Sequence, residues 1–267
     1  MHKLKTVLIC HREEELNRAG LPRWLSSFTQ LCGVVVLEED SKPLRQRIRR
    51  EIRRVGWFRF LDVLAFRVYY RLFLAAADRR AEGQLLDRVS KHYNPPPENT
   101  PTLHVRNPNR PEVEEFIRGA APDLLIARCK FLLQERIFTL PAWGTFVMHP
   151  GICPEYRNAH GCFWALARRD LDKVGMTLLK IDKGVDTGPV YGYYSYPFDE
   201  RRESHVLIQL RTVFENLDII ASKLVEIGNG MATPIDTSGR TSAVWGQPWL
   251  TRYLSWKWHA RKRAVAK

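Results

Sequence analysis

Two short apolar runs separated by a helical pattern constrain the fold of this chain more than any other feature. Residues 5–10 (KTVLIC) and 33–38 (GVVVLE) are rich in β-branched side chains, as buried strands are. Between them, residues 21–31 carry apolar side chains at helical spacing. A strand, a helix and a second strand in this order form a βαβ unit, whose strands lie parallel in one sheet. The chain is therefore predicted to have an α/β fold.

Strands and helices alternate along the remaining chain, which predicts a Rossmann-like, mostly parallel sheet flanked by helices. Helices are predicted at residues 112–118 and 132–138, and strands at 123–128, 144–149, 174–181 and 189–196. The last two strands are expected to extend the sheet in antiparallel fashion. Apolar side chains then recur every three or four positions from residue 203 to 227, before Gly228. This pattern predicts one long amphipathic helix.

The cysteine pattern and the start of the chain bear on the cell compartment. The 267 residues include five cysteines, an odd number, widely spaced and without a CxxC pair. This spacing argues against a disulfide framework and a structural zinc site, so reduced thiols and no metal site are expected. The first apolar segment is too short for a signal peptide. A cytoplasmic protein is predicted.

The net charge of +13 indicates an anionic partner such as a phosphorylated ligand, nucleic acid or a membrane surface. Much of the charge lies in residues 45–54 and 252–267, away from the motifs described below. The second run belongs to a basic C-terminal tail, residues 231–267, that contains several tryptophans. Such a run is more often a solvated surface or a contact in a homodimer than a site for RNA or lipid, so nucleic acid is not the expected partner.

Residues 41–95 form a predicted helical insertion after the second strand. Residues 57–74 are strongly apolar, but Arg59, Asp62, Arg67 and Arg71 interrupt them, which argues against a membrane-spanning helix. Two interpretations remain open. The insertion packs on the domain or on a second subunit, or residues 41–77 lie as a basic interfacial helix on an anionic membrane, which would make the protein peripheral to it.

Two polar loops follow predicted strands. The first lies in GTFVMHPGICPEYRNAHG, residues 144–161, and the second is IDKGVDTGPV, residues 181–190. Parallel α/β sheets bind their ligands at the carboxyl ends of strands. His149 and Asp186 are therefore expected to converge on one cleft.

The motifs in these loops resemble those of the folate-dependent formyltransferases, which include glycinamide ribonucleotide transformylase, methionyl-tRNA formyltransferase and the sugar N-formyltransferases. The matching residues are His149-Pro150-Gly151, Pro154-Glu155-Tyr156-Arg157, and Asp182-Lys183-Gly184-Val185-Asp186-Thr187-Gly188. The resemblance implies a formyltransferase-like catalytic domain at residues 1–230, with 10-formyltetrahydrofolate as co-substrate and a small-molecule amine as acceptor. The segment from His160 to Leu166 is similar to the sugar-type members, which points to an amino sugar linked to a nucleotide. The tail is too short for the additional domain of a methionyl-tRNA formyltransferase.

The resemblance also implies roles for individual residues. His149 would donate to the oxyanion of an acyl-transfer intermediate, and Asp186 would hold its imidazole and help to relay a proton. Residues implied to bind the folate are Arg128, Cys129, Phe131, Leu132, Asp182, Gly184 and Val185. Residues implied to bind the acceptor are Tyr156, Arg157, Asn158 and His160.

Several of these residues also have a purely structural interpretation. Asp182 is more typical of a turn-former than of a catalyst, and Arg157 either binds an anion or pairs within its loop. His160 and Cys153 are expected to pack or to contact substrate rather than to act as nucleophiles.

One position departs from the family pattern. The family has an asparagine two residues before the histidine, where this chain has Val147. The lost oxyanion donor would cost roughly 100- to 1000-fold in turnover. Asn158 could supply the donor instead. The other interpretations left open are a slow enzyme, a different transfer, a formyl hydrolase, or a degenerate protein that binds folate or nucleotide without catalysis.

Overall fold

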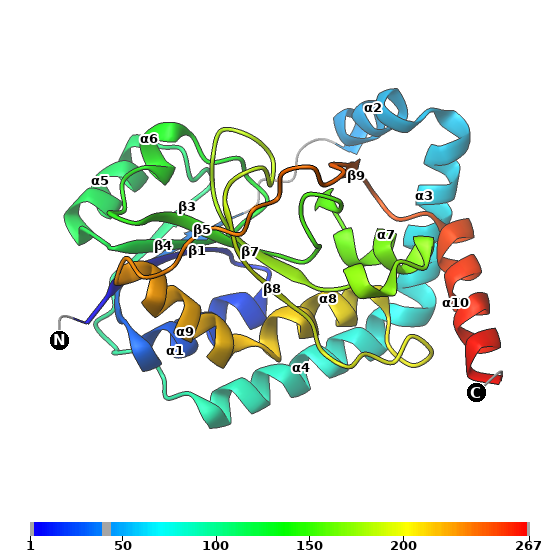
Figure 1. Ribbon diagram of the computed structural model, residues 1–267. Coiled ribbons are helices and arrows are strands. Elements are labelled where there is room, and N and C mark those ends of the chain that lie inside the picture. Colours follow the sequence, from blue (N-terminus) through cyan, green and yellow to red (C-terminus); the bar gives the residue numbers. More distant parts are fainter. Residues whose placement is uncertain (1–2, 39–43, 266–267) are drawn as a thin grey trace.

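The computed structural model describes residues 3–38 and 44–265 and shows one central sheet with helices on both faces (Figure 1). Residues 41–43 of the predicted insertion and the last two residues of the tail lie outside this description. The sheet has seven strands in the order β3-β2-β1-β4-β5-β7-β8. Their bounds are β1 Lys5–His11, β2 Gln30–Leu37, β3 Thr102–Val105, β4 Leu124–Arg128, β5 Gly144–His149, β7 Met176–Lys180 and β8 Val190–Tyr194.

The first five strands in this order are parallel, and β7 and β8 are antiparallel additions at one edge. The predicted α/β class, the mostly parallel sheet and its antiparallel extension are confirmed. Strand β3 was not predicted. Its four residues (TLHV) lie at the other edge of the sheet and mix polar with apolar side chains, so they give no strong strand pattern.

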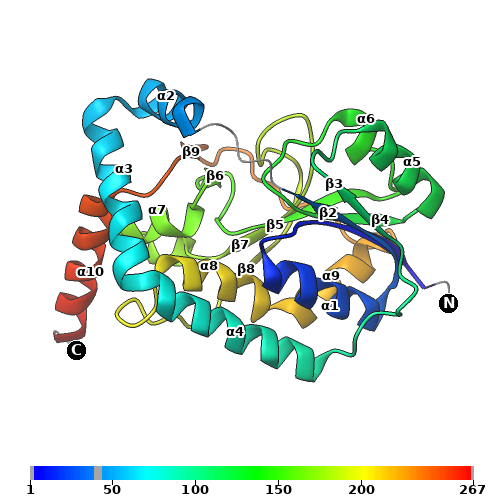
Figure 2. The ribbon, with the colours of Figure 1, turned by 180° about the vertical axis from the view of Figure 1, so that it is seen from behind.

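Each face of the sheet buries its own apolar core, because alternate residues of a strand point to opposite faces. Leu8 and Cys10 belong to the cluster that includes side chains of α1 (Leu21–Phe28), α4 (Ala75–His92) and α9 (Leu217–Gly228). Val7 and Ile9 belong to the cluster with α5 (Pro111–Ala120) and α6 (Glu135–Phe138). The two views show these helix layers on opposite sides of the sheet (Figures 1 and 2).

The predicted long helix at 203–227 is wrong, because the structure has two helices there. Helix α8 spans His205–Phe214, and α9 begins at Leu217. Asn216 lies between them and donates from Nδ2 to the carbonyl oxygens of Thr212 (2.9 Å) and Ser195 (3.1 Å). These bonds stabilise the break between α8 and α9, although the apolar side chains keep their helical spacing across it.

Two other predicted helices are shorter than expected. Helix α6 begins only at Glu135, because residues before it form a loop in which the Gln134 amide donates to the Asn109 side chain at 2.7 Å. Helix α1 ends at Phe28, because Gln30 already pairs with Lys5 in the sheet. A helical turn, η1 (Leu16–Gly20), precedes α1.

The insertion after β2 consists of helices that run from the sheet to the far end of the molecule. They are α2 (Leu44–Val55), α3 (Trp57–Tyr69), the turn η2 (Tyr70–Leu74) and α4. Helix α4 packs on the sheet layer, whereas α2 and α3 lie at the end of the molecule opposite α5 and α6 (Figures 1 and 2). Within the described residues, none of the helices has the length and apolar character needed to cross a bilayer.

The C-terminal segment returns across the molecule and ends beside α3. Its short strand β9 (Val244–Trp245) pairs with β6 (Arg157–Asn158), and α10 (Leu250–Val265) packs on α7 (Gly161–Arg168) and α3. Tyr253 and Trp256 of α10 are buried with Phe66 and Phe163. The region predicted as a basic tail thus contributes to a buried aromatic cluster.

Candidate active site

His149 is the last residue of β5 and lies at the carboxyl end of that strand. Its side chain is buried, and Nε2 lies 2.9 Å from the carbonyl oxygen of Tyr156, to which it donates. Two glycines allow the loop to fold tightly around the ring. A Cβ on Gly151 would lie 2.8 Å from His149 Nε2 and 2.9 Å from Cα of Gly161. The ring is therefore held against its own loop.

Asp186 reaches the same imidazole from the loop between β7 and β8. Its Oδ2 lies 3.5 Å from Nδ1 of His149 and accepts the backbone amide of Asn158 at 2.7 Å. Asp186 has φ 52°, in the left-handed region that aspartate tolerates better than most residues. The structure thus brings the two predicted catalytic residues together, 37 positions apart in the chain.

Both ring nitrogens of His149 face an oxygen. The carboxylate of Asp186 fixes the orientation of the ring from the Nδ1 side, as carboxylates do for catalytic imidazoles. The donor on Nε2 is bound to the Tyr156 carbonyl, so it must exchange that oxygen for a substrate oxygen in order to stabilise an oxyanion. The arrangement has the chemical groups for oxyanion stabilisation and proton transfer.

Three of the residues predicted to bind the acceptor form hydrogen bonds to other segments of the protein. The Tyr156 hydroxyl donates to Asp170 at 2.7 Å, and burial raises the pKa of this phenol. Arg157 donates from one terminal nitrogen to the Val185 carbonyl oxygen at 3.0 Å, and its buried Nε has no hydrogen-bond partner among the described residues. Asn158 donates from Nδ2 to the Trp245 carbonyl oxygen at 2.6 Å. The side-chain amide of Asn158 therefore supports β9 and does not point toward His149 in this conformation.

The buried surroundings of His160 and Cys153 favour the uncharged form of each side chain. His160 has φ 59° and faces the ring of His205 in α8 at 6.0 Å. Burial lowers the pKa of His160 to about 4, so the imidazole is neutral at neutral pH. Burial raises the pKa of Cys153 to about 12, which leaves almost no thiolate.

Val147 lies on the same face of β5 as His149, two residues before it. Its side chain packs in a small apolar cluster with Cys153, Leu179 and Val190. A valine at this position is therefore part of the packing between β5, β7 and β8.

The residues predicted to bind the folate lie on two neighbouring segments. The first segment, residues 128–132, begins at the last residue of β4; in it, Phe131 stacks on His11 at 6.0 Å and Leu132 is 67% exposed. Asp182 lies in the turn after β7, where its Oδ1 accepts the Gly184 amide at 2.9 Å and so acts as a turn-former. Phe131 of the first segment and Ile181 beside the second both pack against the same buried apolar cluster.

A polar network behind the first segment was not predicted. Arg128 is partly buried, and the loss of solvation lowers its pKa; it donates to the Met148 carbonyl oxygen and, at 3.4 Å, to Asn17. Asn17 in turn donates to Glu14 at 2.7 Å. Burial opposes ionisation of Glu14, but the hydrogen bond from Lys130 helps to hold its pKa below the usual value. The run of three glutamates after the first strand is the sequence feature that could have indicated this network.

The C-terminal segment clamps the site loop, which was not predicted either. Arg240 binds both carboxylate oxygens of Glu155, at 3.0 and 2.6 Å, and Trp245 donates from Nε1 to the Glu155 carbonyl oxygen at 2.8 Å. The Trp245 ring stacks on Tyr156 with 5.7 Å between centroids. The loop that carries the candidate acceptor residues therefore depends on a segment near the end of the chain.

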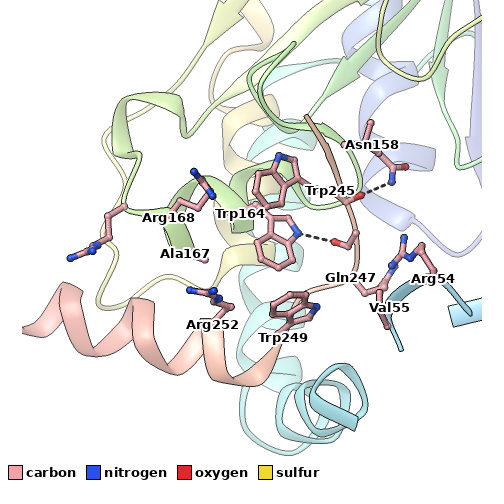
Figure 3. A pocket seen from close by; sticks show the side chains of 13 residues that line it. Arg54, Val55, Asn158, Trp164, Ala167, Arg168, Trp245, Gln247, Trp249 and Arg252 are labelled. Atoms are coloured by element: carbon pink, nitrogen blue, oxygen red, sulfur yellow. Dashed lines mark hydrogen bonds between the residues drawn. The ribbon is translucent and has the colours of Figure 1, made fainter. Parts of the chain in front are cut away.

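A cavity of about 610 Å³ lies beside Asn158, between α7, β9 and α10 (Figure 3). Three indoles form one wall: Trp164 stacks on Trp245 at 5.0 Å and meets Trp249 edge-on at 5.1 Å. Among the described residues that line the cavity, none carries a carboxylate and four are arginines, namely Arg54, Arg168, Arg169 and Arg252. Figure 3 shows Arg168 and Arg252 on one side of the indoles and Arg54 on the other. Such a lining suits a ligand with a flat ring and negative charge.

Comparisons with known proteins agree with the motifs. No family model matches the chain. A methionyl-tRNA formyltransferase from Dehalococcoides mccartyi is 30% identical over 145 residues, which cover 51% of this chain and 42% of that protein. The chain thus spans less than half the length of this relative.

Solved structures share the fold. A sugar N-formyltransferase from a Shewanella species has a TM-score of 0.52 at 12% identity, covering 91% of this chain and 76% of the other. A phosphoribosylglycinamide formyltransferase from Anaplasma phagocytophilum has a TM-score of 0.53 at 14% identity, covering 92% and 100%. The sequence matches confirm the resemblance to formyltransferases, and the solved structures show that the fold is shared.

Proposed function

We propose that the protein transfers a formyl group from 10-formyltetrahydrofolate to the amine of a small molecule, and that this acceptor is an amino sugar linked to a nucleotide. The observation that carries the proposal is the pairing of His149 with Asp186 at the carboxyl end of β5. The methionyl-tRNA formyltransferase match and the sugar N-formyltransferase fold support the reaction class.

The residues around the site suit this chemistry. Acyl transfer to an amine passes through a tetrahedral state whose oxygen carries negative charge and whose nitrogen must lose a proton. His149 would donate from Nε2 to that oxygen once the ring no longer binds the Tyr156 carbonyl. Asp186 would keep the ring oriented and help to relay the proton of the attacking nitrogen through water to N10 of the folate, which leaves as the amine. Both groups are shielded from bulk water, which strengthens their electrostatic effect.

The segments after β4 and β7 fit the folate, which would supply the formyl group. Phe131 and the exposed Leu132 offer an apolar surface for a pterin ring. The backbone of the facing turn can approach the folate closely, because Gly184 has no side chain. The turn also has no room for one, since a Cβ at this position would lie 2.0 Å from Thr187 Oγ1. The Lys183–Glu135 ion pair at 3.0 Å joins the two segments at their rim.

The arginine and tryptophan cavity supports a nucleotide-linked acceptor. A nucleobase can stack on an indole, and guanidinium groups bind phosphate oxygens. Asn158 lines this cavity and also contacts Asp186 through its backbone amide, so the cavity adjoins the candidate catalytic pair.

A second candidate is a formyltransferase-like protein that binds folate or nucleotide without transfer, or one that hydrolyses the formyl donor. Two observations favour it: Val147 offers no amide, and the Nε2 donor of His149 is already bound to Tyr156.

One assay separates these candidates. The purified chain is incubated with 10-formyltetrahydrofolate and a panel of amines that includes nucleotide-linked amino sugars, while folate absorbance and product mass are followed. Amine-dependent turnover that is lost in His149→Ala and Asp186→Ala supports transfer. Folate binding without turnover supports the binding protein, and amine-independent release of formate supports the hydrolase.

A further inference from the structure

Helix α3 and the turn η2 expose large apolar side chains to solvent. Their spacing of three or four residues places most of them on one face of the helix, which we name the outer face of α3. Its members are Trp57 (64% exposed), Phe58 (91%), Leu61 (54%), Leu64 (44%), Val68 (52%), Leu72 (69%) and Phe73 (68%). Contiguous apolar surface of this kind marks an interaction site.

The inner face of the same helix is already satisfied by packing. Phe60, Val63 and Phe66 are buried, and the Phe66 ring contacts Tyr253 of α10 at 5.2 Å. The helix is thus apolar on two opposite sides, and the fold of the described residues covers only one of them. Helix α10 lies beside α3 and exposes Leu254 and Trp258, which add apolar surface at this end of the molecule (Figure 2).

Positive charge surrounds the outer face of α3. Asp62 is the only acidic residue between positions 57 and 74, and it accepts the Thr251 amide at the start of α10 at 3.0 Å. Residues 250–265 contain no acidic residue. Exposed basic side chains on these helices and at the end of α2 are Arg53, Arg54, Arg59, Arg67, Arg71, Arg252, Arg261 and Lys262.

This combination of charge and apolar surface selects one kind of partner. A second copy of the chain on this face would bring arginines against arginines, which opposes association. An anionic bilayer matches both properties, since its phosphates attract the guanidinium groups while its acyl chains accept Trp, Phe and Leu. Arg59, Arg67 and Arg71 on the same helix suit a position parallel to the membrane plane.

We propose that the outer face of α3 docks the protein on the surface of an anionic phospholipid bilayer. The helix lies in the interface between headgroups and acyl chains, and the basic residues beside it contact the headgroups. The arginine and tryptophan cavity then lies close to the membrane, because Trp249 and Arg252 line both that cavity and a second hollow that includes Phe58 and Arg59.

The test is sedimentation of the full chain with vesicles, which needs no enzymatic turnover and is independent of the proposed reaction. The probes are vesicles of phosphatidylcholine alone and of phosphatidylcholine mixed equally with phosphatidylglycerol. We expect binding to the mixed vesicles that weakens as salt rises. The double variant Phe58→Asp/Leu61→Asp should lower this binding by about tenfold or more.

Ile219→Asp is the matched control, because Ile219 is 59% exposed on α9, far from the outer face of α3. It should leave vesicle binding unchanged, and thermal unfolding shows whether each variant is folded. If the wild-type chain ignores anionic vesicles, or if the double variant binds them as the wild type does, the proposal is wrong. A concentration-dependent dimer that the double variant abolishes, without vesicle binding, would assign the face to self-association and also overturn it.

Discussion

Nδ1 of His149 lies 3.5 Å from Oδ2 of Asp186. Asp186→Asn retains an oxygen for the Asn158 amide and tolerates the left-handed backbone, but it removes the charge that faces the imidazole. We expect kcat for the proposed formyl transfer to fall by about 100-fold or more, with thermal unfolding little changed. Asp236→Asn, in an exposed turn, is the control and should leave kcat unchanged. An active Asp186→Asn variant would exclude the carboxylate from the reaction.

Val147→Asn tests whether the missing amide limits catalysis. If the new side chain reaches the oxyanion, kcat should rise, by up to roughly 100-fold. The same change places a polar group among Cys153, Leu179 and Val190, so unfolding free energy should fall by about 1–3 kcal/mol. Val147→Leu controls for altered packing, as it adds no donor. A lower or unchanged kcat in Val147→Asn would mean that the site is built around valine.

Trp245→Ala should loosen the site loop without removing any candidate catalytic group. The change deletes the stack on Tyr156 and the hydrogen bond to the Glu155 carbonyl oxygen. Hydrogen exchange should accelerate at residues 153–158 while the central strands keep their protection, and kcat should fall. Trp143→Ala, at a half-exposed indole, should leave exchange in this loop unchanged. Equal exchange in both variants would show that the loop holds its conformation alone.

Arg252→Gln tests the cavity as an anion site. Arg252 lines the cavity beside the indoles, and a charge-assisted hydrogen bond to phosphate is worth about 1.5–3 kcal/mol. The Kd for a nucleoside diphosphate, measured by calorimetry, should therefore rise by about tenfold or more. Arg110→Gln is the control, because Arg110 is an exposed arginine that directly precedes α5. A nucleotide that binds both variants and the wild type equally would bind elsewhere.

Acid should destabilise the protein through His160. Its pKa is lowered to about 4 in the folded chain, against an ordinary value of 6.5, because burial disfavours the charged ring. Between these values the unfolded chain binds the proton and the folded chain does not, so stability falls as pH drops from 6.5 to 4. The loss should be about 3 kcal/mol at most.

Urea unfolding at several pH values measures this loss, and His160→Asn, which suits φ 59°, should reduce the slope. His205 also titrates below its ordinary range because of burial, so part of the slope should remain in the variant. An unchanged slope would show that His160 takes up its proton while the chain is folded.

The sequence predicted the core of the sheet well, because buried parallel strands such as β1 and β4 are unbroken apolar runs. It failed where distant contacts decide the structure. The break before α9 depends on a bond from Asn216 to Ser195, and apolar periodicity carries no trace of that bond. Local sequence patterns therefore predict most helices and strands, but not all of the residues at which they begin and end.

In the candidate site too, some contacts were predictable from the sequence and others were not. His149 and Asp186 stand in motifs at predicted strand ends, so their approach was predictable from the sheet topology. The pairing of β6 with β9 was not, since Trp245 follows Asn158 by 87 positions and no motif links them. The motif alone indicates a missing donor at Val147, and only its packing partners show that the position belongs to an apolar cluster.

The clamp that β9 places on the site loop also sets an order of events during synthesis. His149 and Tyr156 leave the ribosome well before the strand that supports them, by a delay on the order of ten seconds at ordinary translation rates. During that interval the central sheet can form up to β8, while the loop lacks Arg240 and Trp245. The growing chain therefore holds its candidate catalytic pair before it can hold the loop around it, and the site is completed only when β9 has emerged.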